Sequence, residues 1–451
     1  MNRRSFLQNL ARGAALLPAA RMLGQKEKAR KPNIVLILAD DLGYGEIGQH
    51  SGIPTPNIDS ISRNGVRFTS GYVSCPVCSP TRAGLMTGRY QERFGHEFNP
   101  GPPQQASDDF GLPLEEVTIA DRLKSLGYST GLVGKWHLGY QPRFHPQKRG
   151  FDEFFGFLSG AHPYFPGENP RGNLILRGTE PVDEKEYLTD AFAREAVSFI
   201  RSRKQQPFFL YLAFNAVHNP LQATDKYLSR FSSVSDPKRR AFSAMLSAMD
   251  DGVGRVLSAL DDAGLKDDTL IFFLSDNGGP TRQTSSRNNP LRGYKGDVLE
   301  GGIRVPFAMQ WKRKLPAGTV YEHPVIALDI LPTAVAAAGG SLSQKNPLDG
   351  VDLIAHLNSA QKKPPHESLY WRFGSQSAIR KGDWKLAVLD DGTPQLYNLA
   401  QDIGESKDLA SSEAGKLKEL QADYQAWNSQ LAAPRWEPRR RRRPRRPKRR
   451  A

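Results

Sequence analysis

The feature that most constrains this fold is a short apolar run that ends directly in polar or ionisable residues, and it recurs along the chain. The runs "NIVLILA" and "TLIFFLS" lead into "DDLGYG" and "DNGGP", and the stretches "STGLVGKWHLG" and "PFFLYLAFNAVHNP" have the same form. Short apolar runs of this kind, partly β-branched, are typical of buried strands. The ionisable residues at the ends of the four runs are Asp40, Lys135, His218 and Asp276.

Helical patterns separate these predicted strands, at residues 117–126, 184–203 and 241–263. Strands that alternate with helices predict an α/β fold built on one sheet. Ligands of such sheets bind at the carboxyl ends of the strands. Because the four ionisable residues all follow strands, we expect them to meet in one active site.

The chain changes character beyond about residue 345. Short apolar segments with turn signals such as Asp391-Gly392 predict an antiparallel sheet, and residues 413–431 predict a closing amphipathic helix. We therefore expect an α/β catalytic domain at 31–345 and a smaller subdomain at 346–434.

The two ends of the chain carry most of its net charge of +15. Residues 435–451 contain eleven basic residues and one acid, and residues 1–24 contain four arginines and no acid. The body between them is nearly neutral, so we expect no nucleic-acid partner. We expect the Arg-rich tail, 435–451, to be disordered. No apolar run reaches the roughly 18–20 residues of a membrane span, so we expect no transmembrane segment.

Residues 1–24 resemble a twin-arginine export signal. Arg3-Arg4 precede the pair Phe6-Leu7 and a weakly apolar stretch that ends in small residues. The alternative is a basic, frayed N-terminal helix, but the order of these features favours the signal. We therefore expect an exported protein, periplasmic or extracellular.

Two acidic loops follow predicted strands. Asp40-Asp41 precede two glycines, and Asp276-Asn277 precede two more. Four oxygen-bearing side chains without a soft ligand suit a hard cation, Ca²⁺ or Mg²⁺. Asp, Asn and Gly also form ordinary turns, so either loop alone is weak evidence. Together they predict a metal site.

Cationic side chains accompany the acidic loops. Lys135 and His137 are two residues apart at a strand end, which places both on one face. Lys295 lies in a Gly-rich loop, and Arg82 follows the second cysteine. Taken singly, each fits a solvated surface group. Around a metal, they indicate an anionic substrate such as a phosphate or sulfate ester.

The stretch "SCPVCSPTRAGLMTGR" holds Cys75 and Cys78, the only cysteines in 451 residues. The pair fits a redox dithiol, half of a metal site, or a motif in which one cysteine carries the chemistry. Ser79-Pro80 indicate a helix start, which places Cys78 at a helix N-terminus. There the helix dipole is expected to lower the pKa of a thiol. An exported chain with two cysteines does not depend on a disulfide framework.

Residues 78–89 resemble the Cys-x-Pro-x-Arg signature of formylglycine-dependent (type I) sulfatases, the arylsulfatase-like family of the alkaline-phosphatase-like superfamily. Other landmarks of that family occur in order between about residues 31 and 425: "NIVLILADDLGYG", "TPNIDSISRNGVRFTSGYV", "GLVGKWHLG", "FLYLAFNAVHNP", "LSDNGG" and "LRGYKGDVLEGGIRVP". The resemblance implies a large mixed β-sheet between helices, with a smaller antiparallel sheet at the C-terminal end. It also implies hydrolysis of sulfate esters.

The resemblance implies a role for each matching residue. Cys78 would be oxidised after translation to formylglycine, an aldehyde whose hydrate supplies the nucleophile. One Ca²⁺ would be held by Asp40, Asp41, Cys78, Asp276 and Asn277. The catalytic residues would be Cys78, Arg82, Lys135, His137, His218 and Lys295. Of these, Lys135, His218 and Lys295 would bind the sulfate. Cys75 matches no pattern and is expected to be a bystander.

The substrate is expected to be a sulfated carbohydrate, because several His, Arg and aromatic residues lie in loops of the predicted domains. The candidates to line the pocket beyond the sulfate are His96, His145, Lys148, Arg149, His162, Tyr164, Trp371 and Arg372. Among these we expect His162 and Arg372 to bind substrate. The rivals are a phosphate or phosphonate ester hydrolase of the same superfamily and a catalytically dead polyanion-binding protein. A twin-arginine signal exports folded proteins, so a formylglycine-installing enzyme in the cytoplasm is an expected partner.

Overall fold

The computed structural model describes residues 31–48, 51–167, 173–342, 346–359 and 363–437. The expected export signal and almost all of the Arg-rich tail lie outside these residues. The chain from Pro32 onwards groups into one compact unit that contains the three sheets described below. The boundary expected near residue 345 stays a prediction. No helix in the described part is long and apolar enough to span a bilayer.

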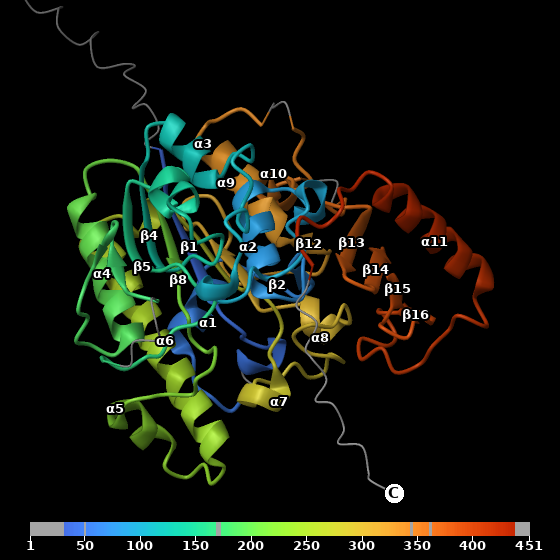
Figure 1. The fold of residues 1–451 in the computed structure, drawn as a ribbon, viewed down its shortest axis with the longest axis horizontal. Coiled ribbons are helices and arrows are strands. Elements are labelled where there is room, and N and C mark those ends of the chain that lie inside the picture. Colours follow the sequence, from blue (N-terminus) through green and yellow to red (C-terminus); the bar gives the residue numbers. More distant parts are fainter. Residues whose placement is uncertain (1–30, 49–50, 168–172, 343–345, 360–362, 438–451) are drawn as a thin grey trace, which may run out of the picture. The chain divides into compact units, whose positions relative to one another are not determined.

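A ten-stranded mixed sheet forms the centre of the molecule (Figure 1). Its strands, in spatial order, are β11 (Thr319–Tyr321), β2 (Val66–Phe68), β10 (Phe307–Gln310), β9 (Thr269–Ser275), β1 (Asn33–Ala39), β8 (Phe208–Ala213), β4 (Ser129–Lys135), β5 (Glu153–Phe157), β6 (Leu176–Arg177) and β7 (Glu180–Pro181). The middle strands β9, β1, β8, β4 and β5 are parallel, and β10 is antiparallel to β9. All four strands expected from the sequence are present in it.

Helices cover both faces of this sheet. Successive side chains of β1 point to opposite faces, and those on each face are buried in a separate core. Ile34, Leu36 and Leu38 belong to one core and Val35 and Ile37 to the other. The first core packs against α2 (Cys78–Thr87), α3 (Ile119–Ser125) and α9 (Ile330–Ala337). The second packs against α1 (Pro56–Arg63), α4 (Leu188–Ser202), α5 (Asp225–Leu228) and α6 (Pro237–Asp262).

The three expected helices are confirmed as α3, α4 and α6, with ends shifted by a few residues. Capping decides two of the shifts. Thr118 and Asp121 form a capping box that starts α3, and Asp236 accepts from the backbone N–H of Lys238 and starts α6 earlier than the apolar pattern alone indicates. The remaining short helices are α7 (Thr281–Thr284), α8 (Glu300–Ile303) and α10 (Leu353–Leu357).

A separate four-stranded antiparallel sheet follows, as the sequence predicts. Its strands are β13 (Ser368–Phe373), β14 (Gln376–Lys381), β15 (Trp384–Val388) and β16 (Pro394–Asn398), and α11 (Ala414–Asn428) follows them. A two-stranded sheet pairs β3 (Gly71–Tyr72) with β12 (Val325–Ile326). The expected fold class, a mixed sheet between helices with a smaller antiparallel sheet, is confirmed.

Candidate active site

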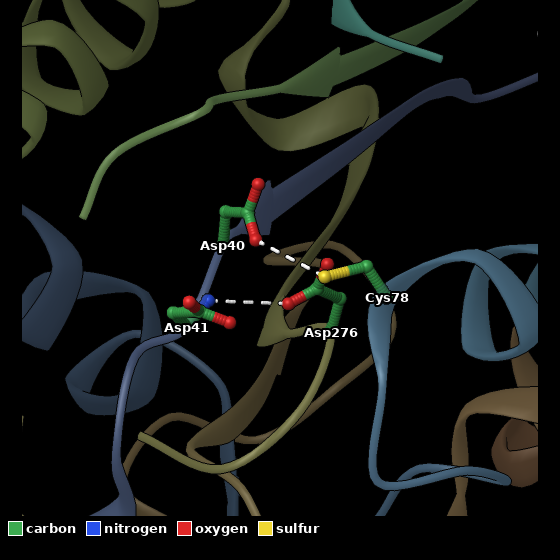
Figure 2. A group of neighbouring side chains, drawn as sticks. All are labelled: Asp40, Asp41, Cys78 and Asp276. Carbon is green, nitrogen blue, oxygen red and sulfur yellow. Dashed lines mark hydrogen bonds between the residues drawn. The ribbon is translucent and has the colours of Figure 1, made fainter. Parts of the chain in front are cut away.

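The two acidic loops meet because their strands are neighbours in register. Strands β1 and β9 are parallel and pair Ala39 with Ser275, so Asp40 and Asp276 leave the sheet side by side. Asp41 has a left-handed φ of 64°, and its backbone N–H donates to Oδ1 of Asp276 over 3.2 Å. All three carboxylates are almost completely buried. Figure 2 shows them converging with Cys78, the first residue of α2.

The geometry of this cluster fits a hard divalent cation. Asp40, Asp41, Asp276 and Cys78 each offer one ligand atom, and these atoms lie within 4.8 Å of one another. Asn277 lies beside them and donates from Nδ2 to Oδ1 of Asp41 over 2.7 Å. Its own Oδ1 is buried and has no hydrogen-bond partner among the described residues. A buried, unpartnered amide oxygen beside three carboxylates is the donor set that Ca²⁺ or Mg²⁺ takes.

Three cations balance the three carboxylates; Arg82 and Lys135 are buried, and Lys295 is partly exposed. The Nζ of Lys135 lies 2.5 Å from Asp40, and the Nζ of Lys295 lies 2.6 Å from Asp41. The guanidinium of Arg82 donates from Nε and Nη2 to one oxygen of Asp276, at 3.1 and 2.8 Å. Buried ions persist only when they are paired in this way. Burial opposes ionisation of Asp40, but Lys135, His218 and Arg82 hold its pKa below the usual range.

Cys78 lies close to both a carboxylate and an ammonium group. Its Sγ is 3.6 Å from Oδ1 of Asp40, and Lys295 donates to it from Nζ over 3.3 Å. Burial first, and the charge of Asp276 second, raise the pKa of the Cys78 thiol to about 12. The expectation that the helix N-terminus lowers this pKa is therefore wrong, because loss of hydration outweighs the helix dipole. The thiol is protonated at neutral pH and is a poor nucleophile as it stands.

Cys75 is a separate, buried thiol. Neither cysteine forms a disulfide. Burial raises the pKa of Cys75 well above that of a free thiol. Its carbonyl accepts from the hydroxyl of Thr81 over 2.7 Å, within the first turn of α2. The pair is therefore not a disulfide here, and only Cys78 belongs to the acidic cluster.

His137 and its neighbours form one wall of the site. His137 has a left-handed φ of 61°, and its carbonyl accepts from the hydroxyl of Ser79 over 2.6 Å. A Cβ added at Gly160 would lie 2.6 Å from the His137 ring, so that position requires glycine. Burial, followed by Lys135 and Arg82, lowers the pKa of His137 well below its usual value. The imidazole is neutral at pH 7.

His218 approaches the cluster from the loop after β8. Its Nε2 lies 3.7 Å from Oδ2 of Asp41, and its Nδ1 donates to the carbonyl of Asn219 over 2.6 Å. A carbonyl can only accept, so Nδ1 carries the hydrogen and Nε2 of the neutral ring is a free base. Burial lowers the pKa of His218, although Asp41 and Asp40 oppose this. Nε2 is thus placed to take or give a proton near the metal-fitting residues.

Several expected pocket residues support the site or the scaffold instead. His96 contacts the Ser79 hydroxyl through Nε2 at 2.7 Å, and burial lowers its pKa to about 3. The Tyr164 hydroxyl donates to the carbonyls of Asn215 and His218, so it holds the His218 loop, and Tyr164 also borders a cavity together with His162. His162 is buried beside this loop, and its carbonyl accepts from Asn215.

The other candidates do not join the cluster. The guanidinium of Arg372 donates to Glu97, Asn428 and the carbonyl of Ala432, which links β13 to two neighbouring segments. Three of the remaining candidates contact the backbone. Trp371 is fully buried and donates to one carbonyl, Arg149 donates to three carbonyls, and His145 contacts the carbonyl of Gly178. Lys148 is exposed. Polar residue type alone could not separate these roles, because scaffold and pocket use the same side chains.

The fold and the site define a hydrolase of the alkaline-phosphatase-like superfamily. The profile of the Sulfatase family matches residues 32–341, and the chain belongs to the sulfatase family, whose members hydrolyse sulfate esters. Human arylsulfatase A is 34% identical over 92% of this chain and 88% of its own length. The dog N-acetylgalactosamine-6-sulfatase is 34% identical over 82% of this chain and 74% of its own. The expected family is confirmed.

A solved structure supports the same assignment. The crystal structure of Ps i-CgsB in complex with k-i-k-neocarrahexaose superposes with a TM-score of 0.85 and 37% identity, over 90% of this chain and 95% of the other. The likeness therefore includes the C-terminal sheet as well as the large one.

Proposed function

We propose that this sulfatase acts on a sulfated carbohydrate, with a formylglycine made from Cys78 and one bound Ca²⁺. The observation that carries the proposal is the position of Cys78 at the start of α2, between the acidic cluster and Lys295. The match of residues 78–89 to the Cys-x-Pro-x-Arg signature supports the conversion of Cys78.

The chain supplies a complete ligand set for the metal. Asp40, Asp41, Asp276 and Asn277 would hold it through hard oxygen atoms, with residue 78 alongside. When bound, a divalent cation draws charge from the sulfate oxygens. A hydrated formylglycine supplies two hydroxyls on one carbon, one to attack sulfur and one whose later deprotonation releases the sulfate.

The remaining residues bind and orient. Lys135 and Lys295 face the cluster from opposite sides and would bind sulfate oxygens as charge develops on them. His218 or Lys295 would help to protonate the leaving alcohol, and His218 would do so from Nε2 once that atom has taken up a proton. Arg82 holds Asp276 through two hydrogen bonds and the end of β4 through the carbonyl of Lys135, so it orients ligands.

The proposed substrate class rests on the relatives. One relative is named for the 6-sulfate of N-acetylgalactosamine, and the i-CgsB structure contains a neocarrahexaose. Both are sugars, and we propose that this chain acts on a sulfated oligosaccharide or polysaccharide. We also propose export through the twin-arginine segment after modification of Cys78 in the cytoplasm, since that route carries folded proteins.

The test is turnover of a panel of sulfated mono- and oligosaccharides beside a simple aryl sulfate, each with its phosphate analogue. We expect release of sulfate from at least one sugar and much faster hydrolysis of sulfate than phosphate. Good aryl sulfate turnover with no sugar desulfated would refute the carbohydrate substrate. Faster hydrolysis of the phosphate esters would make the protein a phosphate ester hydrolase. No turnover of either ester by correctly modified, metal-loaded protein would indicate a polyanion-binding protein.

A further inference from the structure

The loop that carries Lys295 is held by contacts from several segments, among them the C-terminal part of the chain. Lys295 contacts both Asp41 and Cys78, yet its backbone N–H makes only a long hydrogen bond, 3.4 Å, to the carbonyl of Gly279. The next residue, Gly296, has a φ of 96° and donates to the carbonyl of Pro76 over 3.0 Å. The position of the lysine therefore depends on what fixes residues 296–300.

Gln376 at the start of β14 clamps that segment with both ends of one amide. Its Oε1 accepts from the backbone N–H of Val298, and its Nε2 donates to the carbonyl of Gly296, each over 3.1 Å. The side chain is buried, with 7% of the residue exposed. A buried amide that satisfies two backbone groups, one on either side of Asp297, fixes the path of the loop there.

A second contact from the C-terminal part fixes the far end of the segment. The Glu300 backbone N–H donates to Oε2 of Glu405 over 2.8 Å. The Glu300 carboxylate pairs with Lys385 of β15 at 2.9 Å and accepts from the Tyr72 hydroxyl at 2.6 Å. Thus α8 is anchored independently, and Gln376 acts on the four residues between α8 and the lysine.

We propose that Gln376 is a positioning residue for Lys295, so that the four-stranded sheet sets the geometry of a group in the active site. The inference rests on the proposed function, in which Lys295 binds the sulfate. Without the Gln376 amide, the N–H of Val298 and the carbonyl of Gly296 lose their partners, and the loop can relax away from the cluster. Small displacements of a positioned group cost roughly 10²-fold in rate.

The experiment is a double-mutant cycle with Gln376→Ala and Lys295→Ala, measured on the intact, metal-loaded enzyme. We expect Gln376→Ala to lower kcat/KM by roughly 10-fold to 10²-fold. In the Lys295→Ala background the same change is expected to have an effect within about 2-fold, because the group it positions is gone. Equal losses in both backgrounds would overturn the inference, since a purely structural role does not depend on Lys295.

Two variants control for folding. Gln376→Met is nearly the same size but removes both the acceptor for Val298 and the donor to Gly296, so a loss close to that of alanine is expected, and full activity would overturn the inference. Gln430→Ala changes the same residue type in the C-terminal part, where the amide donates to the carbonyl of Ala426 over 3.1 Å and accepts from Arg93, away from the loop. We expect it to leave kcat/KM unchanged. A loss for Gln430→Ala as large as for Gln376→Ala would overturn the inference.

Amide hydrogen exchange provides a readout that needs no turnover. In the wild type, the Val298 amide is expected to exchange slowly, and Gln376→Ala is expected to accelerate it while β1 amides stay protected. Unchanged exchange at Val298 would show that Gln376 does not hold the loop. If the wild type hydrolyses no sulfate ester, the proposed function fails, and this measurement still decides whether the clamp exists.

Discussion

Two clusters of buried charge lie in this molecule, and they are built differently. At the carboxyl edge of the ten-stranded sheet, three carboxylates gather beside Cys78 (Figure 2). They pair with Arg82, Lys135 and Lys295. Beside the four-stranded sheet, Glu300 and Glu405 share Lys385. Both clusters neutralise their ions. The first also contains Asn277 Oδ1 and His137 Nδ1, buried atoms without hydrogen-bond partners among the described residues. In the second, the buried Oε1 of Glu405 lies 2.8 Å from the Nζ of Lys385 and is paired in that way.

This difference distinguishes a functional site from a cluster of charges that only stabilises the fold. Pairing alone does not mark function, because a scaffold must pair its buried ions as well. Unsatisfied ligand atoms beside paired ions indicate a place built for something else. The pKa shifts in the second cluster show how its ions are paired. Burial raises the pKa of Glu405 to about 7, whereas Lys385 and Arg304 overcome burial and lower the pKa of Glu300 to about 2. One lysine thus keeps one carboxylate firmly ionised and shares its charge with a second.

The largest effect is expected at Cys78. Cys78→Ala removes the only group that can become the nucleophile, and we expect turnover of an aryl sulfate to fall ~10³-fold or more. Cys75→Ser changes a thiol outside the cluster and is expected to keep most of the activity. Equal losses from the two substitutions would contradict the separation of their roles.

The second largest effect is expected from metal removal, which affects only the cluster at the active site. A chelator is expected to lower turnover roughly 10²-fold or more, since the charge stabilisation by a metal is worth several kcal/mol. Adding back Ca²⁺ and Mg²⁺ in separate samples identifies the ion, and we expect Ca²⁺ to restore activity. Full activity after exhaustive chelation would contradict a metal role.

Lys385→Met tests the second cluster. The lysine side chain is fully buried between Glu300 and Glu405. Removing one partner of a buried ion pair costs about 3–5 kcal/mol, so we expect a large fall in the free energy of unfolding. Turnover measured well below the melting temperature is expected to change far less than it does for Cys78→Ala. The reverse order of effects would show that this cluster belongs to the site.

His366 gives a pH-dependent contrast between scaffold and site. Its Nε2 lies 2.8 Å from Oδ1 of Asp329, and Asp329 raises the pKa of His366 above 6.5 although burial opposes it. A raised folded-state pKa gives stability that is fully present below pH 6.5 and is lost as the pH rises through the folded value. His366→Ala should therefore destabilise the protein more at pH 6 than at pH 9 in urea unfolding. An equal or larger cost at pH 9 contradicts the assigned pair.

The smallest effect is expected from deletion of residues 438–451. These residues lie outside the described part of the structure, and ten of the fourteen are basic. Both clusters consist of described residues that precede this segment, so kcat and KM for a small aryl sulfate are expected to be unchanged. A loss of turnover on that substrate would give the tail a catalytic role.

The centre of the large sheet could be predicted because each of the four predicted strands is an apolar run with an ionisable residue at or near its end. Asp40, Asp276, Lys135 and His218 follow from that rule, and Cys78 from its motif. The pocket could not be predicted, since Trp371 and Arg372 look like ligand residues and form scaffold contacts. The raised thiol pKa depends on burial, which a local motif does not encode.

Contacts between residues far apart in the sequence could not be predicted either. Gln376 lies 78 residues beyond Val298, in a strand of another sheet, and nothing local distinguishes it from Gln395. Its role follows only from the tertiary contact. The same holds for Tyr164, whose aromatic character indicates a sugar platform but whose hydroxyl holds the backbone of the His218 loop.

The central claim is that Cys78 alone is converted to an aldehyde in the active enzyme. Mass spectrometry of the peptide spanning Cys75 and Cys78, taken from protein of measured sulfatase activity, tests it directly. We predict a peptide in which residue 78 has exchanged sulfur for oxygen and lost two hydrogens, while Cys75 keeps a free thiol. An unmodified Cys78 in fully active enzyme, or a disulfide between the two cysteines, would contradict the account.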